Sequence, residues 1–258
     1  MMTPRECFNA AMNHEQPDRL LLDMGKHIGS IHRRAYAQLK DYLGDANMVN
    51  GEVILDRMAQ TVVPDECLLE RFDIDFRWIV PNWVQVTERE DVPGYIDMWG
   101  VPYKATEDRD HCVVDGAPMR QATLDNIDDF QWPDPNDPEQ FKGLRERAKY
   151  LYENTDYVIG ADAIKAGVLM NSLQMRGYDK FFMDLAIDKP FAEALMDRIL
   201  DTLKEMWSRY MDAVGEYVQI AYVTDDLGSQ TSLLISPRMF RQLLKPRMKE
   251  LHDHIKSC

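Results

Sequence analysis

Short apolar runs of strand length alternate along the chain with longer segments that have helical periodicity. The expected strands are residues 19–24, 72–80, 157–161 and 217–223. The segments between them leave room for helices of about 12 residues or more, which is what a crossover between parallel strands requires. This alternation is the strongest constraint on the fold. It predicts an α/β protein and does not decide whether the sheet is open or closed.

Several of the expected helices begin with explicit capping signals. Thr3 and Glu6 form a capping-box pair around Pro4, which suits the first position of a helix. Residues 189–214 form the longest amphipathic stretch, and Gly215 ends it. Further helices are expected at residues 31–43, 64–71, 138–154, 163–177 and 180–185, and from Ser236-Pro237 to the C-terminus.

Residues 84–129 interrupt the alternation of strands and helices. They are rich in turn residues, aromatic residues and short β-prone pieces such as YIDMWGVPYKA. We therefore expect a loop insertion with one or two hairpins within a single domain of residues 1–258. The proline-dense segment at 132–138 is expected to connect this insertion to the helices that follow.

Composition argues against several classes of partner. The chain has 30 Lys and Arg against 44 Asp and Glu, a formal net charge of −14, whereas nucleic acids and anionic membranes require a basic surface. We therefore expect no nucleic-acid partner and no membrane association. No apolar run approaches the roughly 20 residues that span a bilayer. The cysteines form no CxxC pair, which fits a reducing compartment, so we expect a cytoplasmic location.

Polar residues that follow the expected strands are the first candidates for a functional site, because the C-terminal strand ends of α/β folds gather in one place. These candidates are Asp23, Lys26, His27, Asp75, Arg77, Asp162, Asp225, Asp226 and Gln230. The most distinctive are Asp225 and Asp226, two adjacent acids that end an apolar strand. In a shared cleft, repulsion and burial would raise the pKa of at least one carboxyl and suit it to proton transfer or to binding a cation. Alternatively, one acid caps a turn and the other is solvated.

Arg77 and His27 each admit two interpretations. Arg77 can hold a substrate carboxylate in a bidentate manner, or it can form a salt bridge with Asp73 or Asp75. His27 can take part in catalysis or make a hydrogen bond within its loop. Its spacing from His32 matches no short metal-binding motif.

Several segments, in one order along the chain, resemble the uroporphyrinogen decarboxylase superfamily. They are TPRECFNAAMNHEQPDR at 3–19, LKDYLG at 39–44, DIDFRWIVP at 73–81, IDMWGVPYK at 96–104, WPDP at 132–135, MRGYDKFFMDLAIDKP at 175–190 and DDLGSQTSLLISPRMFRQLLKPRMKELHDHIK at 225–256. The resemblance implies a (β/α)8 TIM barrel with its active site at the C-terminal mouth. In the family register the chain ends after about five or six of the eight strands, so we expect an incomplete barrel, truncated at its C-terminus.

The superfamily contains the decarboxylase of the haem pathway and zinc-dependent methyltransferases that move methyl groups between a corrinoid and a thiol or another carrier. True decarboxylases carry an Arg-Gln-Ala-Gly-Arg loop after the first strand, whereas the loop at residues 24–30 has no arginine. Their Phe-Ser-Asp segment, which holds the catalytic aspartate, is replaced by residues 75–77, and Leu173 stands where they have a tyrosine. These departures favour the methyltransferase branch.

The resemblance therefore implies a methyltransferase that depends on Zn²⁺ and a corrinoid (cobalamin). It would act on a small-molecule methyl donor or acceptor, and the resemblance implies a corrinoid protein as partner. The zinc ligands of that branch, a His-x-Cys element and a later Cys, have no counterpart in this sequence, so we assign no metal ligand. In this hypothesis Asp225 and Asp226 are catalytic, and the residues that contact the substrate are Asp23, His27, Arg77 and Gln230.

Two alternatives to methyl transfer stay open at the level of the sequence. One is the decarboxylation of uroporphyrinogen III, and the other is a barrel fragment without catalytic activity. An incomplete barrel would expose unpaired sheet edges, which are templates for pairing with another chain. We therefore expect the chain to associate with itself.

Overall fold

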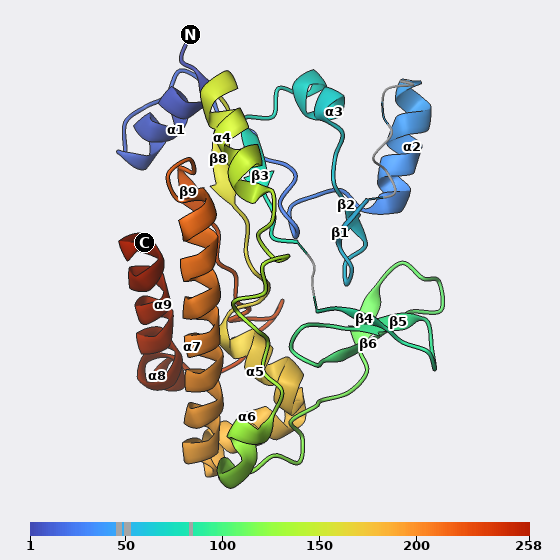
Figure 1. The fold of residues 1–258 in the computed structure, drawn as a ribbon, viewed down its shortest axis with the longest axis vertical. Helices are drawn as coiled ribbons and strands as arrows, with labels where there is room; N and C mark the ends of the chain where they lie inside the picture. The colour runs from blue at the N-terminus through green and yellow to red at the C-terminus, as the bar shows by residue number, and fades with distance from the viewer. Residues whose placement is uncertain (45–47, 49–52, 83–84) are drawn as a thin grey trace.

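A parallel three-stranded sheet lies at the centre of the molecule (Figure 1). The computed structural model describes residues 1–44, 48, 53–82 and 85–258. The strands of the central sheet, in spatial order, are β3 (Phe76–Ile79), β8 (Val158–Ala161) and β9 (Ile220–Ala221). Both neighbouring pairs are parallel and are joined by helical crossovers, which confirms the α/β class expected from the alternation of strands and helices.

The helices follow the capping signals of the sequence. Thr3 and Glu6 make the expected capping box at α1, and α7 occupies the long amphipathic stretch. The α-helices are α1 (Pro4–Met12), α2 (Arg33–Leu43), α3 (Glu66–Arg71), α4 (Leu144–Asn154), α5 (Val168–Arg176), α6 (Tyr178–Ile187), α7 (Lys189–Val214), α8 (Pro237–Met239) and α9 (Lys245–Ser257). A 3₁₀ turn, η1 (Leu124–Asp129), precedes α4, and a π-helical turn, η2 (Phe240–Leu244), joins α8 to α9.

A four-stranded antiparallel sheet lies beside the central sheet, and a short hairpin lies next to it (Figure 1). The strands of the antiparallel sheet, in spatial and chain order, are β4 (Thr87–Glu88), β5 (Gly94–Ile96), β6 (Pro102–Ala105) and β7 (Cys112–Val114). The hairpin consists of β1 (Ile54–Asp56) and β2 (Thr61–Val62). Buried aromatic side chains of the antiparallel sheet, such as Tyr103, belong to the same hydrophobic core as the large helices.

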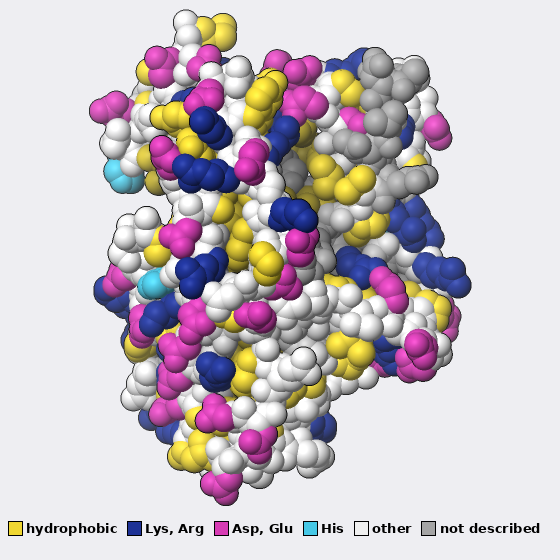
Figure 2. All heavy atoms as spheres, in the orientation of Figure 1, with side chains coloured by type: hydrophobic (Ala, Val, Ile, Leu, Met, Phe, Trp, Pro, Cys, Tyr) yellow, Lys and Arg dark blue, Asp and Glu magenta, His cyan; other side chains and the backbone are white. Residues whose placement is uncertain are grey.

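The main core packs between the parallel sheet and the helices that follow residue 144. Trp207 and Tyr210 of α7 are almost completely buried in it, and α9 runs beside α7 (Figure 1). Burying one large apolar side chain contributes about 1.5–3 kcal/mol, so this cluster is the main source of stability for the scaffold. On the face shown in Figure 2, acidic and basic side chains are interspersed. Among the described residues, every helix is too short or too polar to cross a lipid bilayer.

The prediction of a strand at residues 19–24 is wrong, because a side chain forms hydrogen bonds that a neighbouring strand would otherwise make with this segment. The Asp75 carboxylate accepts a hydrogen bond from the backbone N–H of Leu22 (2.8 Å) and pairs with the Arg19 guanidinium. The Asp75 N–H donates to the Leu22 carbonyl (2.8 Å). These contacts fix the segment beside the start of β3 without a series of strand hydrogen bonds.

The sheet is open, so the closed (β/α)8 barrel that the resemblance implies is not seen in the described part of the chain. β3 and β9 each pair with β8 and form the two edges of the sheet. A barrel requires every strand to have two neighbours. The strand expected at 217–223 is also shorter than predicted, since β9 pairs with β8 only through Ile220 and Ala221.

Candidate active site

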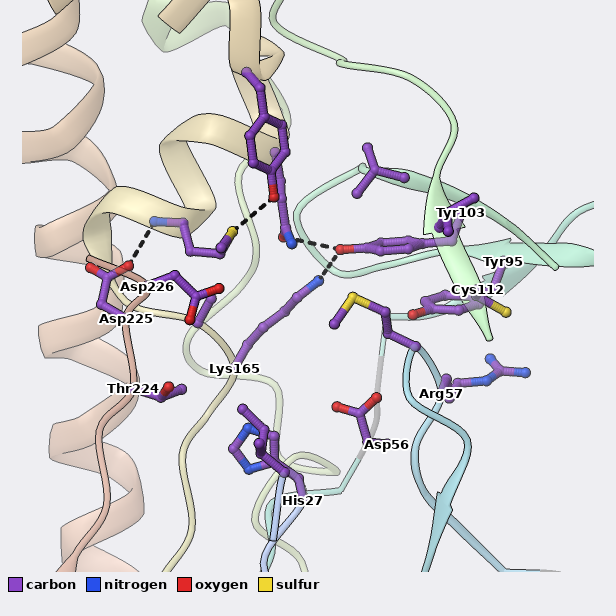
Figure 3. Close-up of a pocket in the computed structure, with 18 residues that line it drawn as sticks. His27, Asp56, Arg57, Tyr95, Tyr103, Cys112, Lys165, Thr224, Asp225 and Asp226 are labelled. Atoms are coloured by element: carbon purple, nitrogen blue, oxygen red, sulfur yellow. Dashed lines mark hydrogen bonds between the residues drawn. The ribbon is translucent and has the colours of Figure 1, made fainter. Parts of the chain in front are cut away.

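A cavity of about 390 Å³ opens where β8 and β9 end (Figure 3). Its opposite wall is formed by the β1–β2 hairpin and by β6 and β7 of the antiparallel sheet, so segments far apart in sequence enclose it. Most of the lining is apolar or aromatic. The charged or titratable side chains of the wall, tyrosines and Cys112 aside, are His27, Asp56, Arg57, Lys165, Asp225 and Asp226. An apolar cavity with a few converging polar groups is typical of a small-molecule site.

Asp225 caps the start of α5 from the far end of the sheet. Its carboxylate accepts hydrogen bonds from the backbone N–H groups of Leu169 and Met170, both at 2.8 Å. The helix comes this close because residue 167 is glycine: a Cβ there would lie 2.7 Å from Asp225 Oδ2. Burial nevertheless raises the pKa of Asp225 to about 6, against the opposing effect of these donors. A carboxyl with this pKa can exchange a proton near neutral pH.

Asp226, the second acid of the pair, is exposed at the rim of the cavity. It faces Tyr178, whose pKa is raised by burial and further by the negative charge of Asp226. The Tyr178 hydroxyl lies 3.1 Å from the sulfur of Met170, on the first turn of α5. The two acids therefore differ in environment: one is packed against a helix start and the other faces solvent.

His27 and Asp162 form a buried pair at the base of the cavity. His27 Nδ1 lies 2.8 Å from Asp162 Oδ1, and the backbone N–H of His27 donates to Asp162 Oδ2 at 2.7 Å. Both residues were candidates because they follow expected strands. The structure joins the loop after residues 19–24, which are not a strand, to the end of β8, 135 residues away in sequence. His27 thus makes the loop hydrogen bond that the sequence allowed and also lines the cavity.

Lys165 is a central residue of the cavity that reasoning from the sequence did not single out. Its ammonium group pairs with Asp97. The same group lies 2.9 Å from the Tyr103 hydroxyl (Figure 3). Burial lowers the pKa of Lys165 to about 7, opposed by the negative charge of Asp56. Its backbone is strained, with φ at 139°, and such strain often accompanies a functional role. The signal in the sequence was one lysine within the otherwise largely apolar segment that follows β8.

On the wall opposite α5, two stacked tyrosine rings each make a cation–π contact. The rings of Tyr95 and Tyr103 lie 4.7 Å apart and nearly parallel. The Arg57 guanidinium lies 4.8 Å from the centroid of Tyr95, and the Lys165 ammonium lies 4.8 Å from that of Tyr103. These contacts hold both cations in place at the edge of the cavity.

Arg77 does not reach the cavity. Its guanidinium pairs with Glu66 (2.6 Å), donates to the carbonyl groups of Ile74 and Phe76, and stacks on the ring of Tyr157 at 3.6 Å. The residue is almost completely buried. The salt-bridge interpretation therefore describes Arg77, with Glu66 as the partner in place of Asp73 or Asp75.

Asp23 and Gln230 also lie outside the residues that line the cavity. Asp23 accepts a hydrogen bond from the indole N–H of Trp78 (2.7 Å) and pairs with Lys26. Gln230 is exposed in the loop after β9. Of the six residues proposed from the sequence, the structure brings together His27, Asp225 and Asp226.

The described residues do not fit a zinc ion. They contain no group of three or more His, Cys, Asp or Glu side chains placed to hold a metal. Cys112 lines the cavity, but burial raises the pKa of its thiol, which disfavours the thiolate that zinc requires.

Comparison with known proteins relates the chain to a family and to a solved fold. The sequence model for uroporphyrinogen decarboxylase (URO-D) matches residues 100–258. The structure of a methyltransferase from Methanosarcina mazei is similar with a TM-score of 0.56 and 15% sequence identity, over 99% of this chain and 68% of that chain. At this identity the likeness concerns the fold alone. None of the curated proteins compared with the chain matches it.

Proposed function

Because the chain belongs to the uroporphyrinogen decarboxylase family, we propose that it transfers a methyl group to or from a small molecule bound in this cavity. A corrinoid, presented by a partner protein, is the proposed second methyl carrier. The observation that supports this choice within the family is the small, largely apolar cavity with its mixed charges. The fold likeness to a methyltransferase is consistent with it.

Decarboxylation of uroporphyrinogen fits the cavity less well. That substrate carries eight carboxylates, which call for many cationic contacts. The cavity has two cations, Arg57 and Lys165, against three acids, and both cations already have acidic partners in Glu88 and Asp97. Its volume of about 390 Å³ lies near the lower end of the range for drug-sized ligands, about 300–1,000 Å³, and suits a smaller molecule.

The residues of the cavity have distinct tasks in the proposed reaction. The aromatic and methionine walls contact the apolar body of the substrate. Lys165 and the Tyr103 hydroxyl, 2.9 Å apart, can meet a carbonyl or anionic oxygen of the substrate. Asp225 can hold or release a proton near neutral pH, since its pKa is about 6. The corrinoid supplies or takes up the methyl group when bound, and no step is assigned to zinc.

The test mixes the purified chain with methylcobalamin, or with the reduced corrinoid, and a panel of small thiols and of O-methyl and N-methyl compounds. The corrinoid is followed by its visible spectrum and the products by mass spectrometry. We expect methyl transfer with at least one member of the panel. The Asp225→Asn variant should lose rate, and the Asp253→Asn variant, on the exposed face of α9, should keep it. Coproporphyrinogen formation from uroporphyrinogen, without any corrinoid reaction, would contradict the proposal.

A further inference from the structure

The His27–Asp162 pair has the geometry of a proton-transfer site. We propose that His27 Nε2 takes a proton from the methyl acceptor bound in the cavity, and that Asp162 positions the imidazole for this step. The inference rests on the proposed function and assigns to it an acceptor class: a small thiol, alcohol or amine that is protonated when it binds. Histidine is the side chain most often used for this task near neutral pH.

Asp162 is fixed by donors on both of its oxygens. It is fully buried directly after β8, and its backbone N–H donates to the Ile79 carbonyl of β3 (2.9 Å). Oδ2 accepts a hydrogen bond from the backbone N–H of His27 (2.7 Å). Oδ1 accepts a hydrogen bond from the backbone N–H of Ala163 (2.8 Å) and lies 2.8 Å from His27 Nδ1. The carboxylate therefore acts as an acceptor towards each of its neighbours.

This arrangement selects one tautomer of His27. Because Asp162 accepts, the proton of a neutral imidazole lies on Nδ1, and Nε2 carries the lone pair. The loop cannot rotate the ring away easily, since the His27 carbonyl also accepts the hydroxyl of Thr61 (2.8 Å). A histidine whose second nitrogen is held by a carboxylate is fixed in its orientation and in its tautomer.

The free nitrogen is the distinctive feature of His27. The residue is only 5% exposed and lines the cavity, yet within the described residues no group bonds to Nε2. The nearest ring, Tyr222, lies 6.0 Å away centre to centre. Nε2 is therefore available to a ligand.

The proposed step calls for no metal ligand from the described residues of this chain. The X–H bond of the acceptor breaks and its proton goes to His27 Nε2, while the electron pair on X forms the new bond to the methyl carbon. A corrinoid donor, when bound, would release the methyl carbon and keep the electron pair of the bond that is broken. In the reverse direction the imidazolium returns the proton to the leaving group.

The first measurement is the tautomer of His27 in the intact chain. Long-range ¹H–¹⁵N spectra of the side-chain nitrogens give the tautomer directly, and the His27→Gln variant assigns the signal among the 6 histidines. We expect the Nδ1–H form in the wild type and a shift towards the Nε2–H form in Asp162→Asn. An Nε2–H form in the wild type overturns the proposal, whatever the activity.

The second measurement is the rate of methyl transfer. Loss of a general base costs typically 10²–10⁴-fold, so we expect His27→Ala to lose at least about 100-fold in kcat with little change in KM, and added imidazole to restore part of the rate. His14→Ala, at an exposed turn, is the matched control. A His27→Ala rate within threefold of the wild type overturns the proposal. So does a loss that imidazole does not restore in a variant that keeps the wild-type melting temperature.

The two measurements separate this inference from the function on which it rests. A wild type that transfers methyl groups while His27→Ala remains active contradicts the role of His27 and leaves the proposed function standing. A wild type without methyl transfer contradicts the proposed function. In that case the tautomer still supports or refutes the His27–Asp162 pair as a proton-transfer site for another reaction in the same cavity.

Discussion

The raised pKa of Asp225 predicts a stability that falls as the pH rises. Burial moves this pKa from 3.8 to about 6, so between these values the folded chain holds a proton that the unfolded chain releases. Stability from this group is complete below about pH 4 and is lost as the pH rises through about 6. The shift corresponds to about 3 kcal/mol in total, of which about 2 kcal/mol falls between pH 4.5 and 7.5.

The measurement compares the wild type with Asp225→Asn by urea unfolding at several values between pH 4.5 and 7.5. Asparagine cannot ionise, and its loss of one acceptor for the N–H groups of Leu169 and Met170 is the same at every pH. The difference in unfolding free energy, wild type minus variant, should therefore decrease by about 2 kcal/mol over this range. The many other carboxylates titrate in both proteins and cancel.

Asp226→Asn is the matched control, because it removes a charge at the neighbouring position and leaves the carboxyl of Asp225 in place. Its effect on the pKa of Asp225 should be small, since repulsion by Asp226 is the weakest of the causes that act on that group. A wild-type minus Asp225→Asn difference that stays constant or increases with pH would refute the reasoning. It would show that the helix N–H donors outweigh burial.

Three further predictions test other parts of the structure. The rate at which an amine-reactive reagent labels Lys165, followed by mass spectrometry, should reach half its maximum near pH 7, because burial lowers the pKa of this lysine. A half-maximal rate near pH 10 would contradict this prediction. A Cβ at residue 160 would lie 2.4 Å from the Trp78 ring, so Gly160→Ala should cost about 1–3 kcal/mol in urea unfolding, and an unchanged midpoint would rule out this crowding. Arg176→Met should cost about 3–5 kcal/mol in the same assay, because it leaves the buried Asp184 carboxylate without its 2.7 Å partner; a neutral effect would mean that Lys180 suffices.

Features encoded within a few residues could be predicted from the sequence, whereas contacts between distant residues, such as that of Gly160 with Trp78, could not. The bounds of α7 and the capping box at Thr3 are encoded within a few residues, and both were predicted. The run at residues 19–24 has the composition of a strand but is not one, because the Asp75 side chain occupies its backbone N–H. The composition of this run gives no indication that Asp75, more than 50 residues away, is its hydrogen-bonding partner.

The α/β class, most of the helix bounds, and His27, Asp225 and Asp226 as residues of the candidate site could be predicted from the amino-acid sequence alone. This was possible because periodicity and capping act between residues no more than about four positions apart. Which of these side chains lie in contact depends on the packing of the whole chain. That packing placed His27 against Asp162, committed Arg77 to Glu66, and brought Lys165 beside Tyr103 from another sheet. Those contacts depend on how strand ends and loops pack across the whole chain, and a local pattern carries no information about them.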